Sequence, residues 1–147
     1  MLVKKMENIN QPSESIRNIV ARHSPKKAYK LIAQEYGGKA AGLLLSAILL
    51  RDEIARGEVC LPFGLAASYK ELPRCIGDVY GILCRQNIRE VIVRSSAVGE
   101  DSFTDRMAGV GISQSIELES ERKFAEDFIN YYEECKSKVE IGGINPE

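Results

Sequence analysis

One apolar run constrains the fold of this chain more than any other feature. From Lys39 the sequence reads Lys-Ala-Ala-Gly-Leu-Leu-Leu-Ser-Ala-Ile-Leu-Leu, and Arg51 then restores polarity. Good helix formers dominate this run and apolar residues fall on nearly every side, so it predicts a helix whose first half is buried on most faces. Its uncharged part, residues 40–50, has 11 residues, whereas a helix that crosses a bilayer needs about 20. We therefore expect a core helix and no membrane-spanning segment.

Composition and charge narrow the class of protein further. A chain of 147 residues has the size of about one domain, and its 44% hydrophobic and 28% charged residues are typical of globular proteins. The 20 basic and 21 acidic residues give a net charge of −1. Such a chain has no overall field that attracts nucleic acid or an anionic membrane. We expect neither as a partner, and any anion site must be local.

The N-terminal residues and the cysteines indicate the compartment in which the chain is found. Lys4 and Lys5 are followed by Met6-Glu7-Asn8-Ile9-Asn10, which lacks the apolar run of a secretory signal, so we expect a cytoplasmic protein. The four cysteines form no Cys-x-x-Cys pair and the chain has one histidine, His23. Buried free thiols are therefore expected, and no metal site.

The periodicity predicts a mixture of helices and short strands. We expect helices from Ser13 to about residue 24, from about Lys26 to Tyr36, from Lys39 to about Gly57, at 71–85 and from Ser120 to about Val139. Strands are expected at 59–61, resuming at 65–67, at 91–93 as a buried central strand, and at 112–118. Residues 1–12 are interpreted as a loose arm or a short added element. The polar, glycine-rich stretch 95–111 has the composition of a functional loop.

Gly37-Gly38-Lys39 is the first candidate for a binding site. Glycines at a helix start let backbone N–H groups approach an anion, the helix dipole favours negative charge, and Lys39 adds a full positive charge. The P-loop pattern is not met, because Ala40 stands where Ser or Thr should follow the lysine. A plain helix boundary is the alternative.

The second candidate follows the predicted strand 91–93. Arg94, Ser95 and Ser96 leave the strand end, where ligands of α/β proteins commonly bind, and a guanidinium suits bidentate contact with phosphate. The alternative is a structural ion pair of Arg94 with Glu100 or Asp101.

Two further features are weaker candidates. Ala108-Gly109-Val110-Gly111 favours a lid whose amides cover phosphates, or a hairpin turn. Lys26, Lys27 and Lys30 form a small basic group that we interpret as a solvated helix face.

Together, three motifs resemble a known family. Gly37-Gly38-Lys39-Ala40-Ala41, Leu61-Pro62-Phe63-Gly64-Leu65 and Val93-Arg94-Ser95-Ser96-Ala97-Val98-Gly99-Glu100-Asp101 occur in that order. They resemble the N-terminal ATP-binding region of the phosphoenolpyruvate synthase and pyruvate phosphate dikinase family. The resemblance spans about Tyr36 to Gly111. It implies an α/β (α+β) fold, with N-terminal helices and a small mixed sheet forming the first half of a dikinase-type ATP-grasp domain. Residues 1–25, an arm and a short helix, lie outside it, and residues 26–147 form the partial ATP-binding domain.

The resemblance also assigns roles to residues. Lys39 and Arg94 hold the ATP phosphates, the glycine loop around Gly109 folds over them, and Ser113, usually Thr in the family, contacts phosphate. The supporting loops carry Gly37, Gly38, Ser95, Ser96, Glu100 and Asp101. The lid departs from the family pattern, because Val110 stands where Gln is usual and Arg106 where Ser is usual.

No residue of the chain is assigned a catalytic or metal-binding role. The family's magnesium ligands, adenine pocket, phosphorylated histidine and pyruvate barrel belong to regions that do not fit in 147 residues. ATP with Mg²⁺ is the expected cofactor, its metal ligands lying in that missing half, and a second chain or domain, or self-association, is expected to complete the site. Such an ATP-dependent phosphotransferase fragment is not expected to turn over by itself. The alternative is a non-catalytic nucleotide- or protein-binding regulatory module with the same fold.

Overall fold

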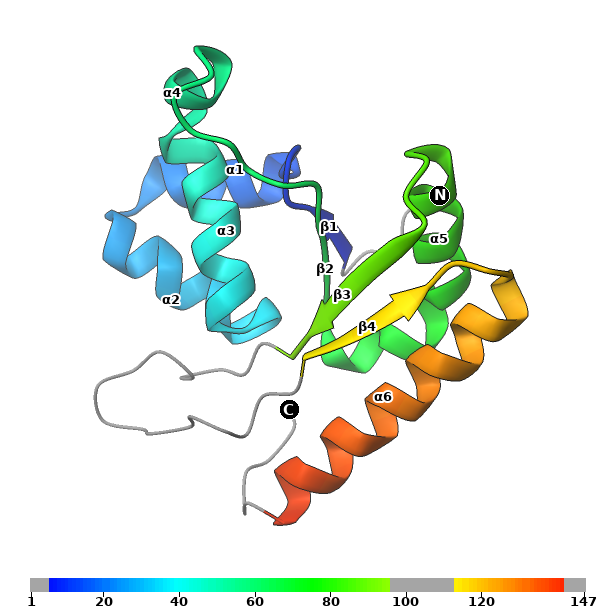
Figure 1. The fold of residues 1–147 in the computed structure, drawn as a ribbon. Helices are drawn as coiled ribbons and strands as arrows, with labels where there is room; N and C mark the ends of the chain where they lie inside the picture. The colour runs from blue at the N-terminus through cyan, green and yellow to red at the C-terminus, as the bar shows by residue number, and fades with distance from the viewer. Residues whose placement is uncertain (1–5, 96–112, 142–147) are drawn as a thin grey trace. The chain divides into compact units, whose positions relative to one another are not determined.

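The structure, a computed structural model, describes residues 6–95 and 113–141 (Figure 1). In chain order the elements are β1 (Met6–Asn8), α1 (Glu14–Arg22), α2 (Pro25–Tyr36), α3 (Gly38–Leu49), α4 (Arg51–Ala55), β2 (Leu65–Ala67), η1 (Tyr69–Glu71, a 3₁₀ turn), α5 (Leu72–Arg85), β3 (Glu90–Arg94), β4 (Ser113–Glu117) and α6 (Glu121–Ile141). These elements separate into two compact units. We call residues 6–68 the N-terminal unit and residues 69–95 with 113–141 the C-terminal unit.

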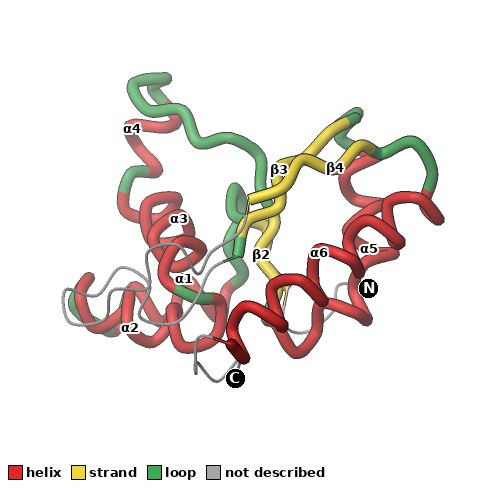
Figure 2. The backbone as a smooth tube through the Cα atoms, turned by 60° about the horizontal axis from the view of Figure 1, so that its bottom comes forward, coloured by secondary structure: helices red, strands yellow, loops and turns green. Residues whose placement is uncertain are grey.

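Helices dominate both units, and each unit has one small sheet, as Figure 2 shows. β1 pairs with β2, and β3 pairs with β4, both antiparallel. The α+β class is therefore confirmed. The expected single mixed sheet is wrong for the described residues, because each of the four strands finds one antiparallel partner within its own unit.

Local capping explains where the first helices begin and end. The Ser13 hydroxyl accepts from the Ile16 N–H and starts α1, and Ser24 does the same for α2 through Lys27. The buried Glu7 carboxylate in turn accepts from the backbone N–H of Ser13 at 2.9 Å and from its hydroxyl at 2.5 Å. Such caps stabilise a helix by about 1 kcal/mol each. The predicted starts of both helices are confirmed within a residue.

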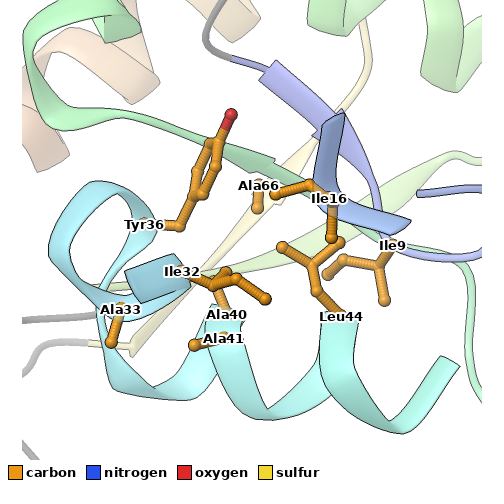
Figure 3. Close-up of a cluster of buried hydrophobic side chains, with 9 residues drawn as sticks. All are labelled: Ile9, Ile16, Ile32, Ala33, Tyr36, Ala40, Ala41, Leu44 and Ala66. Carbon is orange, nitrogen blue, oxygen red and sulfur yellow. The ribbon is translucent and has the colours of Figure 1, made fainter. Parts of the chain in front are cut away.

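The core of the N-terminal unit lies among α1, α2 and α3 (Figure 3). Its buried side chains come from all three helices, from the residue that follows β1 and from β2: Ile9, Ile16, Ile32, Ala33, Tyr36, Ala40, Ala41, Leu44 and Ala66. In α3 the buried residues Gly38, Ala40, Ala41 and Leu44 lie in the first half of the helix, as predicted, whereas Leu49 is 49% exposed. Small residues at 40 and 41 let α2 and α3 approach closely.

Residues 6–13 are an integral part of this unit and not a loose arm. β1 extends over Met6–Asn8, and the Ile9 N–H continues the pairing by donating to the Gly64 carbonyl at 2.9 Å. The Asn10 amide donates to the carbonyls of Leu61 (3.2 Å) and Pro62 (3.1 Å), and its oxygen accepts from the Gly64 N–H at 3.0 Å. These three hydrogen bonds take the place of strand pairing at residues 61–64. The strand predicted at 59–61 is therefore wrong, and in this segment the strand covers residues 65–67.

In the C-terminal unit the β3–β4 hairpin packs against α6, and α6 packs against α5. α5 and α6 contact each other, and β4 contacts α6. A chain of neighbouring rings joins α5 to α6, with centroid distances of 5.5 Å for Tyr80–Phe124, 5.7 Å for Phe124–Phe128 and 6.3 Å for Phe128–Tyr131. The prediction that the aromatic stripe of the last helix belongs to a core is confirmed.

Two sequence-based expectations about burial need correction. Strand β3 is not buried on both faces, because Ile92 is 61% exposed while Val91 and Val93 are half-buried. Of the four thiols, Cys75 and Cys135 are buried, whereas Cys60 and Cys84 are exposed. Burial raises the pKa of the Cys75 thiol and keeps it protonated.

Substitutions at two glycines of α3 are expected to act in opposite directions. Gly37 has φ 82°, so Gly37→Ala forces an L side chain into a left-handed conformation and should lower the free energy of unfolding by about 1–2 kcal/mol. Gly42 lies inside α3 and a Cβ there meets nothing within 4 Å, so the matched Gly42→Ala should raise it by about 0.5–1 kcal/mol. Urea unfolding followed by circular dichroism measures both. Equal effects would contradict the strained turn.

Candidate functional site

The turn between α2 and α3 is the start of a helix without a side-chain cap. Gly37 ends α2, its N–H donating to the Ala33 carbonyl at 2.8 Å, and its own carbonyl accepts from the Ala41 N–H at 3.0 Å in α3. It has no side chain to cap α3, and the first turn of α3 contains no acidic residue. Lys39 lies in this turn and is half-buried. The positive end of the α3 dipole and a lysine therefore coincide.

The second part of the candidate site is the end of the β3–β4 hairpin. Arg94 and Ser113 are directly paired across the two strands. Their side chains point to the same face, with Cβ atoms about 4.5–5.5 Å apart. Both residues are exposed. A guanidinium and a hydroxyl at this separation are suited to hold two oxygens of one phosphate group.

The hairpin has one packed face and one open face. Alternation along the strands places Gln114 and Ile116 on the packed face, and Ile116 is buried. The open face carries the exposed residues of both strands: Glu90, Ile92, Arg94, Ser113, Ser115 and Glu117. Arg94 and Ser113 therefore lie on the solvent-facing side, where a ligand has access.

Charge is polarised along this open face. At the end opposite Arg94, the like-charged Glu90 and Glu117 are direct cross-strand partners, and Glu90 accepts from the Ser115 hydroxyl. A polar hollow of about 300 Å³ adjoins that end, lined by Ser115, Glu117, Glu119, Lys123 and Asp127. Lys123 donates to Asp127 at 3.2 Å, a bond that raises the pKa of its ammonium group. The hollow is acidic overall, so a phosphate is favoured only at the Arg94 end of the hairpin.

Helix α6 positions the residue that follows Arg94. The Tyr131 hydroxyl forms hydrogen bonds with Ser95 and with Cys135, and the tyrosine is buried. Burial is the main cause that raises the pKa of Tyr131 far above its ordinary value, while the contact with Ser95 acts in the opposite direction. Tyr131 thus links α6 to the residue that follows Arg94.

The structure brings together some of the predicted site residues. Arg94, Ser95 and Ser113 lie together at one end of the hairpin in the C-terminal unit, and Gly37, Gly38 and Lys39 form one turn of the N-terminal unit. The other predicted positions, Ser96, Glu100, Asp101 and Gly109, lie outside the described residues. Where the chain is described, no group of three or more His, Cys, Asp or Glu side chains is placed to hold a metal ion.

Sequence reasoning missed the roles of three residues. Tyr131 was assigned only to the core, Asn10 was assigned to the arm, and Ile92 was assigned to a buried strand. The period of two along a strand places Ile92 on the same face as Glu90 and Arg94, and these two flanking charges are the signal that this face is exposed. No comparable local signal exists for Asn10, whose partners lie more than 50 positions away.

Comparison with known proteins adds no relative: no family model, curated protein or solved structure matches the chain. Within the described residues, no helix is long and apolar enough to cross a membrane.

Tyr131→Phe is expected to change the alkaline stability of the protein. Below pH 10.0, the ordinary pKa of tyrosine, the phenol is protonated in both the folded and the unfolded chain. Above it, the unfolded chain loses the proton whereas folded Tyr131 retains it, so the free energy of unfolding falls as pH rises. Tyr131→Phe should make this fall shallower. Urea unfolding at a series of alkaline pH values measures the slope.

Tyr132→Phe, on the same helix, is the matched control, because it removes a tyrosine hydroxyl from α6 at a neighbouring position. The same alkaline slope for Tyr131→Phe and for the unmodified protein would contradict the assigned environment of Tyr131. At neutral pH, Tyr131→Phe should also be less stable, because the Ser95 and Cys135 contacts are lost.

Proposed function

We propose that this chain is the ATP-binding N-terminal part of a phosphoenolpyruvate synthase-like phosphotransferase, with the first half of an ATP-grasp fold. The observation that supports it most is the pairing of Arg94 with Ser113 on the open face of the hairpin. The family resemblance assigns both positions to the ATP phosphates. Their placement as direct cross-strand neighbours, which the resemblance does not require, is consistent with one phosphate bound between them.

The α2–α3 turn of the N-terminal unit is considered by itself, and only the family resemblance assigns its Lys39 to the ATP phosphates. Backbone N–H groups at the start of α3, together with Lys39, favour a phosphate there for the same electrostatic reasons. The proposal places the chain in the cytoplasm, where ATP is abundant.

The proposal takes the Mg²⁺ ligands from outside the described residues, as the family resemblance implies. Mg²⁺ prefers carboxylate oxygens and water, and the described acidic side chains form no suitable group. The role of this chain is then to orient the phosphates, while a second chain or domain, or another copy of this chain, supplies the metal ligands. Transfer of the phosphoryl group is a property of that complete assembly.

A non-catalytic protein-binding module is the second candidate, and one observation favours it. Leu43, Leu49 and Leu50, at and beside the exposed side of α3, have 37–49% of their surface exposed. Exposed apolar groups of this size on neighbouring turns commonly mark a contact with another protein. Under this alternative, association with a partner or with itself does not depend on Arg94.

Arg94→Ala should weaken binding of Mg-ATP by about 10- to 100-fold, because a hydrogen bond to a charged group is worth about 1.5–3 kcal/mol. Lys39→Ala should weaken it by a similar factor. Isothermal titration calorimetry of the full chain measures the dissociation constants. Arg89→Ala is the matched control, since Arg89 is an exposed arginine just before the opposite end of β3.

The outcomes separate the two candidate functions. Unchanged affinity in both Arg94→Ala and Lys39→Ala would refute the assigned phosphate site. Absence of Mg-ATP binding by the unmodified chain, combined with self-association in sedimentation velocity that Leu49→Asp abolishes, would favour the protein-binding module.

A further inference from the structure

The first two helices carry a concentration of positive charge that the net charge of the chain conceals. Residues 15–34 contain five Lys and Arg residues, one histidine and no Asp or Glu. The other 127 residues carry 15 basic and 21 acidic side chains. A local charge of +5 therefore exists within a chain whose net charge is −1.

The structure gathers four of these cations around the α1–α2 turn. Arg22 is the last residue of α1, and Lys26, Lys27 and Lys30 occupy the first half of α2. At 100° per residue the three lysines span about 100° of the helix surface, away from the face that buries Ala28 and Ile32. We call Arg22, Lys26, Lys27 and Lys30 the basic patch.

The basic patch is accessible and lacks compensating charge. All four side chains are exposed. None of them has an ion pair with a described residue, a property that they share with other exposed cations such as Lys70, Arg74 and Arg89. The repulsion among these four cations is therefore not offset by an ion pair in the described part of the free protein.

Helix geometry increases this repulsion. Lys26 and Lys27 lie in the first turn of α2, at the positive end of its dipole, and that turn contains no acidic residue. Acidic residues are the usual choice at such a position, because cations there destabilise a helix. A bound anion relieves both the repulsion between lysines and the unfavourable interaction with the dipole.

We propose that the basic patch binds the phosphate backbone of a nucleic acid without regard to base sequence. Lysines one helical turn apart are separated by about 5–6 Å, so neighbouring cations of the patch can contact successive phosphates of one strand. A polyanion binds such a surface with a gain from released counterions that a single small anion does not provide. The net charge of the whole chain predicted no nucleic-acid partner, and the local charge of this patch is the ground for proposing one.

Two other polyanionic partners fit the structure less well. An anionic membrane binds helices that expose large apolar residues beside their basic residues, but Ile16, Ala28, Ile32 and Ala33 of α1 and α2 are buried. The exposed large apolar residues of the N-terminal unit, Leu43, Leu49 and Leu50, lie at α3 and its C-terminal end. An acidic peptide that docks as a helix needs an apolar groove, whereas the patch offers charge alone.

This site is independent of the proposed ATP site. It includes neither Lys39 nor Arg94, and its four residues lie in α1 and α2 before the Gly37 turn. Failure of one proposal therefore leaves the other in place, and Lys39→Ala is expected to leave nucleic-acid binding nearly unchanged.

Fluorescence anisotropy with a labelled DNA duplex and a labelled single-stranded RNA, both of arbitrary sequence, tests the proposal. The full chain should bind both at low salt. With about four phosphates neutralised, the logarithm of the affinity for the duplex should fall with the logarithm of salt concentration with a slope of about −3.6. The double variant Lys26→Gln/Lys30→Gln should reduce this slope by about 1.8 and weaken binding at least about tenfold.

The matched control is Lys70→Gln/Arg74→Gln, which removes the same charge from exposed positions at the start of the C-terminal unit. It should bind like the unmodified chain, and circular dichroism should show that both double variants remain folded. Three results would overturn the proposal: no binding at low salt, equal weakening by both double variants, or binding to phosphatidylserine vesicles but to neither nucleic acid. Binding only to a polyglutamate peptide would overturn it as well.

Discussion

The left-handed conformation of Gly37 is the constraint on which the N-terminal unit depends. With φ 82° this one residue ends α2 and begins α3, so two helices follow each other without a linker. Tyr36 on one side of it and Ala40 and Ala41 on the other are buried in the same core. A side chain at position 37 would favour a different turn and separate these surfaces. The same conformation leaves α3 without a side-chain cap and places Lys39 in its first turn, so packing and the candidate anion site have one common cause.

Local and distant interactions differ in how far the sequence predicts them. The starts of α1 and α2 follow from Ser13 and Ser24, which bond to N–H groups three residues away. Their positions are therefore readable from the sequence. The partner of β1 is not, because it lies nearly 60 residues away and its three-residue strand has no distinctive pattern. Asn10 illustrates the limit: its bonds to residues 61–64 decide that this segment is not a strand, and no nearby residue indicates them.

The candidate phosphate site was predicted in its residues but not in its geometry. A β-branched run followed by arginine and serines indicates a strand end with polar groups, and β3 does end at Arg94. Composition could not distinguish a central strand from a two-stranded hairpin, because Val and Ile are common in both. That difference decides the chemistry. A hairpin has an open face, and on it Arg94 meets Ser113 while Glu90 and Glu117 create negative charge at the other end.

The exposed surfaces of α2 and α6 differ in how their charges are paired. On α6, Arg122 faces Glu126 and Lys123 faces Asp127, each pair four residues apart, so cations are balanced along the helix itself. On α2 the residues four positions after Lys26, Lys27 and Lys30 are Lys30, Leu31 and Gln34, and none of them is acidic. Lysines that serve only solubility are expected to alternate with acidic residues, as they do on α6, because charges of alternating sign do not repel one another. The lysines of α2 have no acidic residue at these positions, and this difference from α6 is the observation behind the proposed binding of a polyanion.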